Sequence, residues 1–356
     1  MSVIRRHFPL LLAVIAIATL SDCGSDHVGH VGYVSLAGAN QVAGYKIDGS
    51  GKLSAITGSP FSGGSLPEGL YIHSSKKFLY VANEGGGNIS LFTIDSSSGT
   101  LTESSSRTTA GTNPAALAVD SNGKFLFVAN SGSDNISVYS INSTSGTLTP
   151  VTGSPFPTGA KPIALTVSSN GFLYVANSNS GSVSAYSISS SSGQLTEISG
   201  SPFAAGTDPY SVVTDPGGHF LYVANLVSGF ISAFTIDSSS GSLTTISNYS
   251  AGTNPISVSV DTTGKYVYVA NSGSSNVSAF SIDSSTGALT QISGSPFTAG
   301  STPVFAVVDA TGKFLYVGDQ SSKIYGFSIS TTGALSGTTG SPYSVNSTPS
   351  SMFTMQ

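Results

Sequence analysis

The sequence has little charge, one cysteine and no tryptophan. Only 8% of its 356 residues are Asp, Glu, Lys or Arg, and the formal net charge is −5. This balance excludes the basic surface of a nucleic-acid-binding protein and differs from the charge-rich composition of disordered chains. The single Cys23 excludes intrachain disulfides and zinc sites built from several thiolates. Because 39% of the residues are hydrophobic, a core can form, and packing must hold the fold together.

Residues 1–22 have the pattern of a secretory signal peptide. Two arginines precede an apolar run from Leu10 to Leu20, which is too short for a comfortable membrane span. The four residues that end at Cys23 resemble a bacterial lipoprotein box and imply that Cys23 carries a lipid, although Asp22 replaces the usual small residue. We therefore expect an exported protein, periplasmic or extracellular, with residues 23–30 as a tether to the membrane. A signal peptide that is cleaved without lipidation is the alternative.

The remaining residues, 31–356, form an internal repeat. A Tyr-Val-Ala-Asn motif or a variant of it recurs every 46 to 48 residues, at 33, 80, 127, 174, 222, 268 and 316. A ladder of prolines keeps the same step, at 67, 114, 162, 209, 255, 303 and 349. Each copy contains four short apolar runs separated by turn residues, which is typical of four antiparallel strands, here called a to d in chain order. The repeat indicates one domain of stacked units.

Strand b of each copy is apolar on both faces. In one copy, Phe125 and Phe127 point one way, whereas Leu126 and Val128 point the other. A sheet with two apolar faces must be covered on both sides, and radial stacking of seven sheets achieves this. The sequence thus predicts an all-β, seven-bladed β-propeller with four antiparallel strands per blade. Pro150 in strand d lacks an N–H group and places that strand at the outer edge.

The two ends of the repeat region are offset from the blades. The first copy begins with strand b near Val31, whereas the chain ends with residues 349–355, which align with strand a. We expect this C-terminal strand to join the N-terminal blade and close the ring, because closure removes two open sheet edges. The last eight residues are therefore predicted to be essential for the fold.

The repeated segments resemble those of a known family. The Tyr-Val-Ala-Asn segments at 80, 174, 222 and 268 and the Ser-Pro-Phe segments at 59, 154, 201 and 295 are similar to those of YVTN-type repeat proteins in the seven-bladed, lactonase-like propeller superfamily. The resemblance covers residues 31–356. It implies the fold, and it includes lactonases of the bacterial 6-phosphogluconolactonase type, a fungal carboxymuconate lactonising enzyme and exported surface proteins. Because one fold hosts many functions, the resemblance specifies the function only loosely.

The resemblance further implies that the b–c loops and the d–a connections share one face, where the central channel opens and a ligand site would lie. We expect the residue before each proline to ring this mouth. Asn113, Lys161, Asp208 and Asn254 are the candidate ligand-binding residues among them. Lys161 and Asp208 lie on adjacent connections, where they could bind a small polar ligand or form an ion pair with each other; we expect the ion pair.

A lactonase needs a base that activates water and a group that stabilises the oxyanion. Glu68, Glu84 and Asp208 are the candidate catalytic bases on this face, and no histidine accompanies them in the repeat. The charged turn residues on the opposite face and the asparagines after strand b recur in most copies, so we assign them to structure. Neither a metal site nor a cofactor motif is found, and none is expected.

Two functional hypotheses follow. The leading one is a binding scaffold in the cell envelope that engages a protein or a glycan, because polar loops repeat without a singular reactive residue. The alternative is a lactone hydrolase that resembles 6-phosphogluconolactonase and acts on a small lactone. Export argues against a phosphorylated sugar substrate, and so does the shortage of basic residues on this face. We expect a monomer, no nucleic-acid partner, and contact with a membrane only through the N-terminal lipid.

Overall fold

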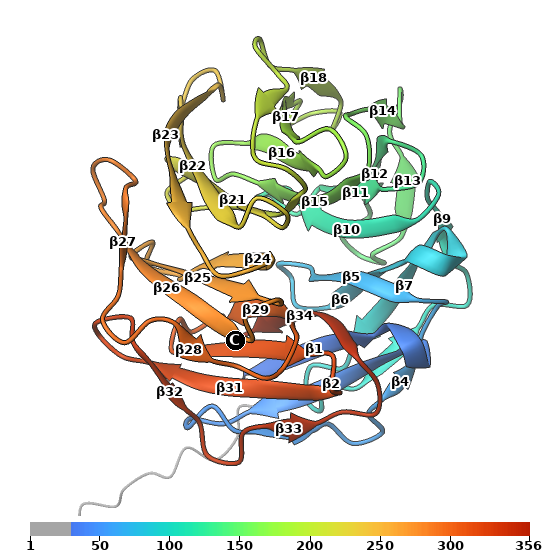
Figure 1. Ribbon diagram of the computed structural model, residues 1–356. Helices are drawn as coiled ribbons and strands as arrows, with labels where there is room; N and C mark the ends of the chain where they lie inside the picture. Colours follow the sequence, from blue (N-terminus) through green and yellow to red (C-terminus); the bar gives the residue numbers. More distant parts are fainter. Residues whose placement is uncertain (1–29) are drawn as a thin grey trace, which may run out of the picture.

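The computed structural model describes residues 30–356 and shows seven antiparallel sheets arranged as blades around a central axis (Figure 1). The predicted all-β, seven-bladed propeller is thus confirmed. Blade 1 has the strand order β34–β1–β2–β3, and blades 2 to 7 follow in chain order. The predicted signal peptide and Cys23 lie outside the described residues. Among residues 30–356, no helix has the length and apolar character that crossing a membrane requires.

Strands a and b form the inner half of every blade. The innermost strands are β5 (Pro67–Ile72), β10 (Pro114–Val119), β15 (Pro162–Val167), β20 (Pro209–Thr214), β24 (Pro255–Val260), β29 (Pro303–Val308) and β34 (Pro349–Met355). The second strands are β1 (Val31–Leu36), β6 (Phe78–Asn83), β11 (Phe125–Asn130), β16 (Phe172–Asn177), β21 (Phe220–Asn225), β25 (Tyr266–Asn271) and β30 (Phe314–Asp319).

Strands c and d form the outer half. The third strands are β2 (Gln41–Ile47), β7 (Asn88–Ile94), β12 (Asn135–Ile141), β17 (Ser182–Ile188), β22 (Phe230–Ile236), β26 (Asn276–Ile282) and β31 (Lys323–Ile329). The outer strands are β3 (Leu53–Ala55), β8 (Leu101–Glu103), β13 (Leu148–Pro150), β18 (Leu195–Glu197), β23 (Leu243–Ser250), β27 (Leu289–Gln291) and β32 (Leu335–Gly337). Pro150 therefore lies at a sheet edge, as predicted.

Six blades carry a fifth, two-residue strand that the sequence does not predict. It pairs with strand c beyond the end of strand d. These strands are β4 (Phe61–Ser62), β9 (Thr108–Thr109), β14 (Phe156–Pro157), β19 (Phe203–Ala204), β28 (Phe297–Thr298) and β33 (Tyr343–Ser344). In blade 5 the continuous β23 pairs with strand c along its whole length instead. Two short 3-10 turns, η1 (Ala37–Ala39) and η2 (Glu84–Gly86), occupy b–c loops.

The C-terminal strand closes the ring. Antiparallel pairing of β34 with β1 runs from Val31 opposite Met355 to Leu36 opposite Pro349. Blade 1 is therefore built from both ends of the described chain, as predicted. His30, at the end of the expected tether, also belongs to this blade: its carbonyl accepts a hydrogen bond from Ile47 N–H at 2.8 Å.

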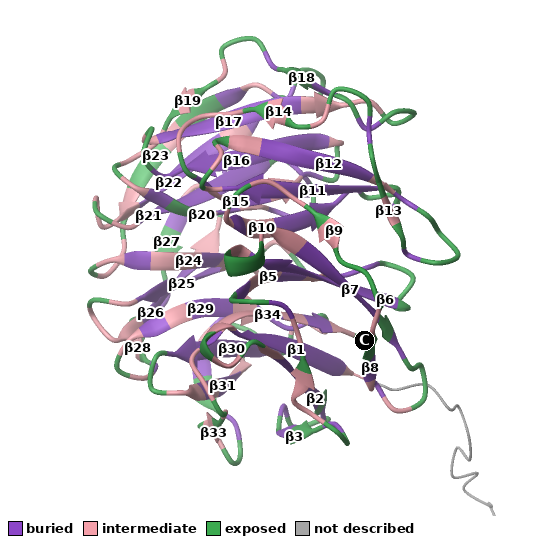
Figure 2. Cartoon of the chain, turned by 90° about the vertical axis from the view of Figure 1, so that its right-hand side faces the viewer, coloured by how far each residue is buried: buried purple, intermediate pink, exposed green. Residues whose placement is uncertain are grey.

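The core consists of seven hydrophobic clusters, each shared by two adjacent blades. The two faces of each strand b pack against the two adjacent blades. Strand b is therefore buried along almost its whole length in all blades. Figure 2 shows this distribution, with buried residues in the strands and exposed residues in the loops between them. No single blade has a core of its own, because each cluster needs side chains from two blades.

The recurring polar residues hold loops and turns, as predicted. In blade 3, Asp120 accepts backbone hydrogen bonds from Lys124 and Phe125 across the a–b turn, both at 2.6 Å. The buried Asn130 accepts from Gly111 N–H at 3.1 Å and donates to Ser137 Oγ at 2.9 Å. Equivalent bonds in other blades fix the loops that surround the channel.

Candidate functional site

Each innermost strand begins with a β-bulge that turns one residue into the channel. In blade 3, Pro114 lies opposite Asn130 and the next pair is Ala116 with Ala129, so Ala115 is skipped by the ladder. Bulges re-aim side chains in this way at many functional sites. The skipped residues line a common cavity, and we call this set the post-proline ring: Glu68, Ala115, Ile163, Tyr210, Ile256, Val304 and Ser350.

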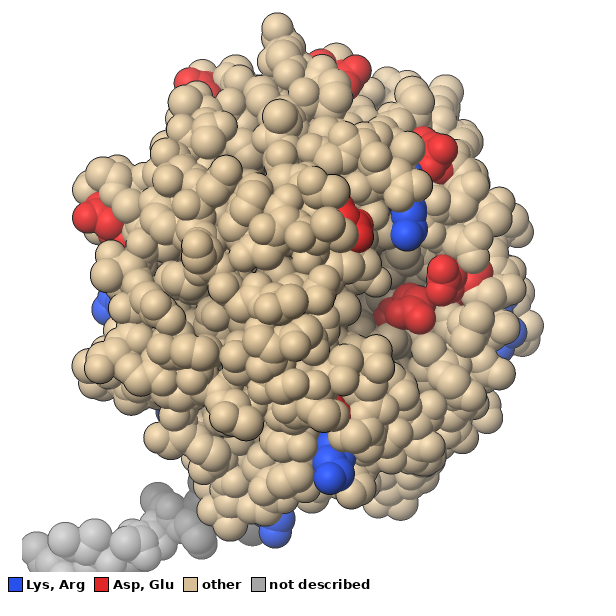
Figure 3. Space-filling view, viewed as in Figure 1, with Lys and Arg blue, Asp and Glu red and all other residues tan. Residues whose placement is uncertain are grey.

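The post-proline ring surrounds a cavity of about 570 Å³ at the mouth of the channel. This size suits a small molecule. Residues of the b–c loops complete the rim, among them Glu84, Ser131 and Gln320. Figure 3 shows a hollow on this face, with acidic side chains grouped beside it and a basic side chain close by. The charged groups of the cavity are therefore gathered on one side of it.

Glu68 breaks the symmetry of the post-proline ring, because the other six members are uncharged side chains. Its bulge has one extra residue, as in the other blades. Pro67 lies opposite Asn83 and the next pair is Leu70 with Val81, so Glu68 and Gly69 lie opposite the single residue Ala82. A Cβ atom on Gly69 would lie 2.7 Å from the carbonyl oxygen of Ala115, so only glycine lets this strand pass its neighbour so closely.

The surroundings of Glu68 tune its ionisation. Burial, and secondly the negative charge of Glu84, raise the pKa of Glu68 to about 7, while a hydrogen bond with Ser350 opposes the shift. Burial also raises the pKa of Tyr210, and the charges of Glu68, Asp208 and Glu84 add to that effect. A carboxyl group whose pKa lies near neutrality can both accept and return a proton at physiological pH.

Three of the candidate residues line the cavity, namely Glu68, Glu84 and Lys161. The expectation that the residues before the prolines ring the mouth is wrong for most blades. Of that set, only Lys161 and Thr348 line the cavity, because the bulge directs the residue after the proline inward. The residues that ring the mouth therefore directly follow the prolines, whereas the residues expected from the sequence are those that precede them.

Lys161 and Asp208 do not form the predicted ion pair. Among residues 30–356 the ion pairs are His30–Asp309, Arg107–Glu103 and His219–Asp215. Ser178 separates the two residues: its N–H donates to the carbonyl oxygen of Lys161 at 2.9 Å, and its hydroxyl donates to the carboxylate of Asp208. No carboxylate within the described chain is therefore bound to the Lys161 ammonium, which borders the cavity.

Asn113 and Asn254 line shallow recesses between the loops rather than the central cavity. Both adopt a left-handed backbone, with φ of 53°. Their carbonyl oxygens accept hydrogen bonds from Ser131 N–H and Ser272 N–H, each at 2.9 Å. These contacts give the two asparagines a role in the loop structure, and ligand binding by them stays a prediction.

Tyr210 is the functional candidate that sequence reasoning missed. It belongs to the post-proline ring and is 37% exposed, unusually high for a large aromatic residue in this molecule. The variation among the seven copies at this position is the sequence signal that could have identified it. The position after the proline varies from Glu to Ala, Ile, Tyr, Val and Ser, whereas the third position after it is always an aliphatic residue or Met.

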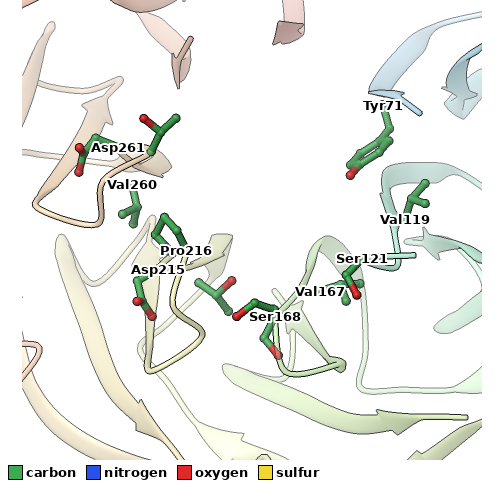
Figure 4. A pocket seen from close by; sticks show the side chains of 12 residues that line it. Tyr71, Val119, Ser121, Val167, Ser168, Asp215, Pro216, Val260 and Asp261 are labelled. Atoms are coloured by element: carbon green, nitrogen blue, oxygen red, sulfur yellow. The ribbon is translucent and has the colours of Figure 1, made fainter. Parts of the chain in front are cut away.

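The opposite mouth of the channel has a different character. A cavity of about 370 Å³ lies there, between the a–b turns. Figure 4 shows Tyr71, Ser121 and Ser168 around this opening. The carboxylate of Asp215 accepts hydrogen bonds from the backbone of its own turn, at 2.7 Å from His219 N–H and 2.6 Å from Phe220 N–H. At this opening the carboxylate of Asp215 thus stabilises its own turn. We therefore place the candidate site at the other mouth of the channel, where Glu68 lies.

Comparisons with known proteins agree with this fold. A crystal structure of a 6-phosphogluconolactonase-type protein from Bacteroides fragilis has a TM-score of 0.82 and 20% identity, with 94% of this chain and 100% of that chain covered. Its counterpart from Bacteroides uniformis has a TM-score of 0.81 and 18% identity, with 92% and 99% covered. The periplasmic gluconolactonase PpgL of Pseudomonas aeruginosa has a TM-score of 0.79 and 19% identity, with 92% and 99% covered. No curated protein matches the sequence.

The family model described as "Lactonase, 7-bladed beta-propeller" matches overlapping segments of the sequence: residues 18–113, 52–160, 104–214, 203–307 and 258–348. Together these segments span most of the chain, and they coincide with the repeated blades. The chain therefore belongs to the lactonase family of seven-bladed β-propellers.

Proposed function

We propose that the protein hydrolyses a small lactone in the cavity around Glu68, with Glu68 as the general base. The observation that carries this proposal is the position of Glu68. It is the one carboxyl group among seven equivalent positions of the post-proline ring, and burial together with Glu84 raises its pKa to about 7. Family membership supports the same class of reaction.

The chain supplies the groups that such a reaction needs. Ionised Glu68 takes a proton from a water molecule, whose oxygen then bonds to the lactone carbonyl carbon. Lys161 and Tyr210 line the same cavity, and their ammonium and hydroxyl groups are the candidate donors to the resulting oxyanion. When the ring C–O bond breaks, protonated Glu68 returns its proton to the leaving oxygen. The product is an open-chain hydroxy acid, and no cofactor is consumed.

The charge of the cavity favours an uncharged lactone over a phosphorylated one. Lys161 is the single basic residue among the residues that line it, whereas Glu68 and Glu84 are acidic. A phosphate group is usually held by several cationic or N–H donors, and two nearby carboxylates would repel it. The similar periplasmic gluconolactonase carries a name that refers to an unphosphorylated substrate class.

The test is lactone hydrolysis by the purified protein, measured as proton release. The panel contains glucono-δ-lactone, its 6-phosphate and unsubstituted δ-valerolactone. We expect saturable turnover of at least one uncharged lactone, with kcat/KM that rises with pH through about 7 as Glu68 ionises. E68Q should lower kcat/KM by about 10²-fold or more, because a positioned base contributes about 10²- to 10⁴-fold.

The matched control is E197Q, which makes the same chemical change on the outer strand β18, where Glu197 is exposed. It should leave kcat/KM unchanged. Turnover by E68Q equal to that of the unaltered protein would remove Glu68 from the mechanism. No turnover of any lactone above the spontaneous rate would reject the enzymatic proposal and leave the binding scaffold for a protein or glycan as the standing prediction.

We propose in addition that the protein acts outside the cytoplasm and is held at a membrane by a lipid on Cys23. The support is the N-terminal pattern of a charged segment, an apolar run and a lipoprotein-like box. Cell fractionation of the unaltered protein and of C23A tests it. The unaltered protein should pellet with membranes and C23A should be released in soluble form; equal distribution would contradict lipidation.

A further inference from the structure

The post-proline residues that face Glu68 across the cavity are aromatic or aliphatic. Blades 5 and 6 stand across the channel from blade 2, since they are the third and fourth blades after it in a ring of seven. They contribute Tyr210 and Ile256 to the wall, and blade 7 adds Val304 and the buried Phe305. A molecule whose reacting group lies at Glu68 would therefore extend the rest of its structure over aliphatic and aromatic side chains.

Four of the serine hydroxyls that line the cavity make hydrogen bonds to the backbone. Ser350 Oγ donates to Pro67 O at 2.8 Å, and Ser131 Oγ donates to Asn113 O at 3.0 Å. Ser211 Oγ accepts from Val258 N–H at 3.1 Å, and in the same way Ser257 Oγ accepts from the next strand's Ala306 N–H at 3.1 Å. These bonds tie the innermost strands together. The side chains of Ile256 and Val304 carry no polar atom, so ligand hydroxyls that face them would be desolvated without compensation.

An exposed leucine precedes the strand that carries Glu68. Within residues 30–356, three large hydrophobic side chains are clearly exposed: Leu66, Tyr210 and Val227. Tyr210 belongs to the cavity. Leu66 is 43% exposed and precedes Pro67, and its carbonyl oxygen accepts a hydrogen bond from Glu84 N–H at 2.8 Å. It occupies a left-handed backbone position, φ 49°, where equivalent copies have Asn113 and Asn254. A left-handed backbone is uncommon for leucine, and this copy thus departs from the polar residues at the equivalent positions.

We propose that the cavity takes uncharged lactones with an alkyl or aryl substituent, with the ester group at Glu68 and the substituent on the wall formed by Tyr210, Ile256 and Val304. The inference rests on the proposed lactonase function and specifies its substrate class. Each methylene that leaves water for this wall adds favourable transfer free energy, whereas a sugar hydroxyl placed there loses its hydration.

The experiment compares δ-decalactone with glucono-δ-lactone, since both have a six-membered ring and differ in their substituents. We expect kcat/KM for δ-decalactone to exceed that for glucono-δ-lactone by at least about tenfold, the scale on which apolar pockets discriminate. V304T adds a hydroxyl at nearly constant shape and I256N places an amide on the wall. Both should reduce the preference for δ-decalactone, with thermal unfolding measured to verify the fold.

The control is V227N, which makes a similar polar change at a residue that is 63% exposed and does not line the cavity. It should leave the preference unchanged. If glucono-δ-lactone is hydrolysed as well as or better than δ-decalactone, the apolar-substituent proposal is overturned while the lactonase function stands.

If neither lactone is hydrolysed, the lactonase function fails, and direct binding of δ-decalactone, measured by titration calorimetry, decides the remaining question. Binding that I256N weakens at least about fivefold would support the apolar wall as a ligand site. No binding to the unaltered protein, or binding that I256N and V304T leave unchanged, would overturn it.

Discussion

At the scale of single residues, departures from the repeat indicate function better than the repeat does. The same strand position occurs in all seven copies of the repeat, so the other six copies serve as internal controls for the copy that contains Glu68. Glu68 stands at a position where the other copies have small, aliphatic or aromatic residues, although the bulge that directs it inward is the same as in blade 3. A catalytic group is needed once, whereas a residue that supports the fold is needed in every blade.

The raised pKa of Glu68 predicts a stability change with pH. The folded state binds the Glu68 proton more tightly than the unfolded state, with a pKa of about 7 against 4.5. The contribution of Glu68 to stability is therefore fully present below pH 4.5 and is lost as the pH rises to about 7. E68Q, which stays neutral, should gain about 1–3 kcal/mol relative to the unaltered protein between pH 5 and pH 8. Urea unfolding at both pH values measures this difference; a difference that does not change with pH would contradict it.

The buried asparagines after strand b should contribute unequally. Asn225 Oδ1 accepts from Gly206 N–H at 2.9 Å and its Nδ2 donates to Ser232 Oγ at 3.0 Å, whereas Asn83 Oδ1 is buried without a partner. N225A breaks the bond from Gly206 N–H, which has no counterpart at Asn83. It should therefore cost about 1 kcal/mol more in the free energy of unfolding. Equal losses in urea unfolding would show that the acceptor bond to Gly206 contributes nothing.

At the scale of elements, one hydrogen bond joins nearly every pair of adjacent blades. The buried tyrosine of strand b donates its hydroxyl to the carbonyl of a glycine in the c–d turn of the next blade. The distances lie between 2.6 and 3.0 Å for Tyr33–Gly99, Tyr80–Gly146, Tyr174–Gly241, Tyr222–Gly287, Tyr268–Gly333 and Tyr316–Gly51. Blade 3 has Phe127 at this position, so the step to the Gly193 turn of blade 4 lacks this bond.

F127Y should complete this ring of bonds. The new hydroxyl would face the Gly193 carbonyl in the geometry that the six tyrosines share, and such a bond contributes about 0.5–1.5 kcal/mol. The free energy of unfolding should therefore rise by about that amount, as measured in urea. Y174F is the matched reverse change and should lower it similarly. A loss of stability in F127Y would mean that the interface between blades 3 and 4 has no room for the hydroxyl.

The sequence predicts long, regular elements better than short ones. Strand b was predictable because its aromatic and aliphatic residues alternate over the whole strand, as at Phe125 and Leu126. The fifth strands were not, because two residues such as Phe156 and Pro157 are too few to show a period. The bulge at Pro114 was missed for a related reason: it shifts the register by one residue without an obvious sequence signal. Glu68 and Glu84 were found as candidates, but the post-proline ring and Tyr210 were not.

At the scale of the whole molecule, the propeller separates stability from chemistry. Seven interfaces between blades hold the core, and each uses nearly the same residues. The innermost strands contribute to these clusters through residues such as Leu117 and Val258, whereas their post-proline residues face the channel. Their post-proline positions can therefore change from Ala to Glu or Tyr without loss of core packing. An asymmetric site can thus arise at the centre of a symmetric scaffold.

This architecture makes the C-terminal strand decisive for stability. Removal of residues 349–356 deletes β34, leaves β1 without its inner partner and takes Met352 from the cluster between blades 7 and 1. The inner edge of β1 would then be open. We expect the truncated chain to lose its cooperative thermal transition or to aggregate, whereas removal of Gln356 alone, which is exposed and outside the strand, should leave it unchanged. Addition of a synthetic 349–356 peptide should restore part of the transition, because the ring is closed by noncovalent pairing. A truncated chain that unfolds cooperatively at the original temperature would show that six complete blades and an open seventh suffice for the fold.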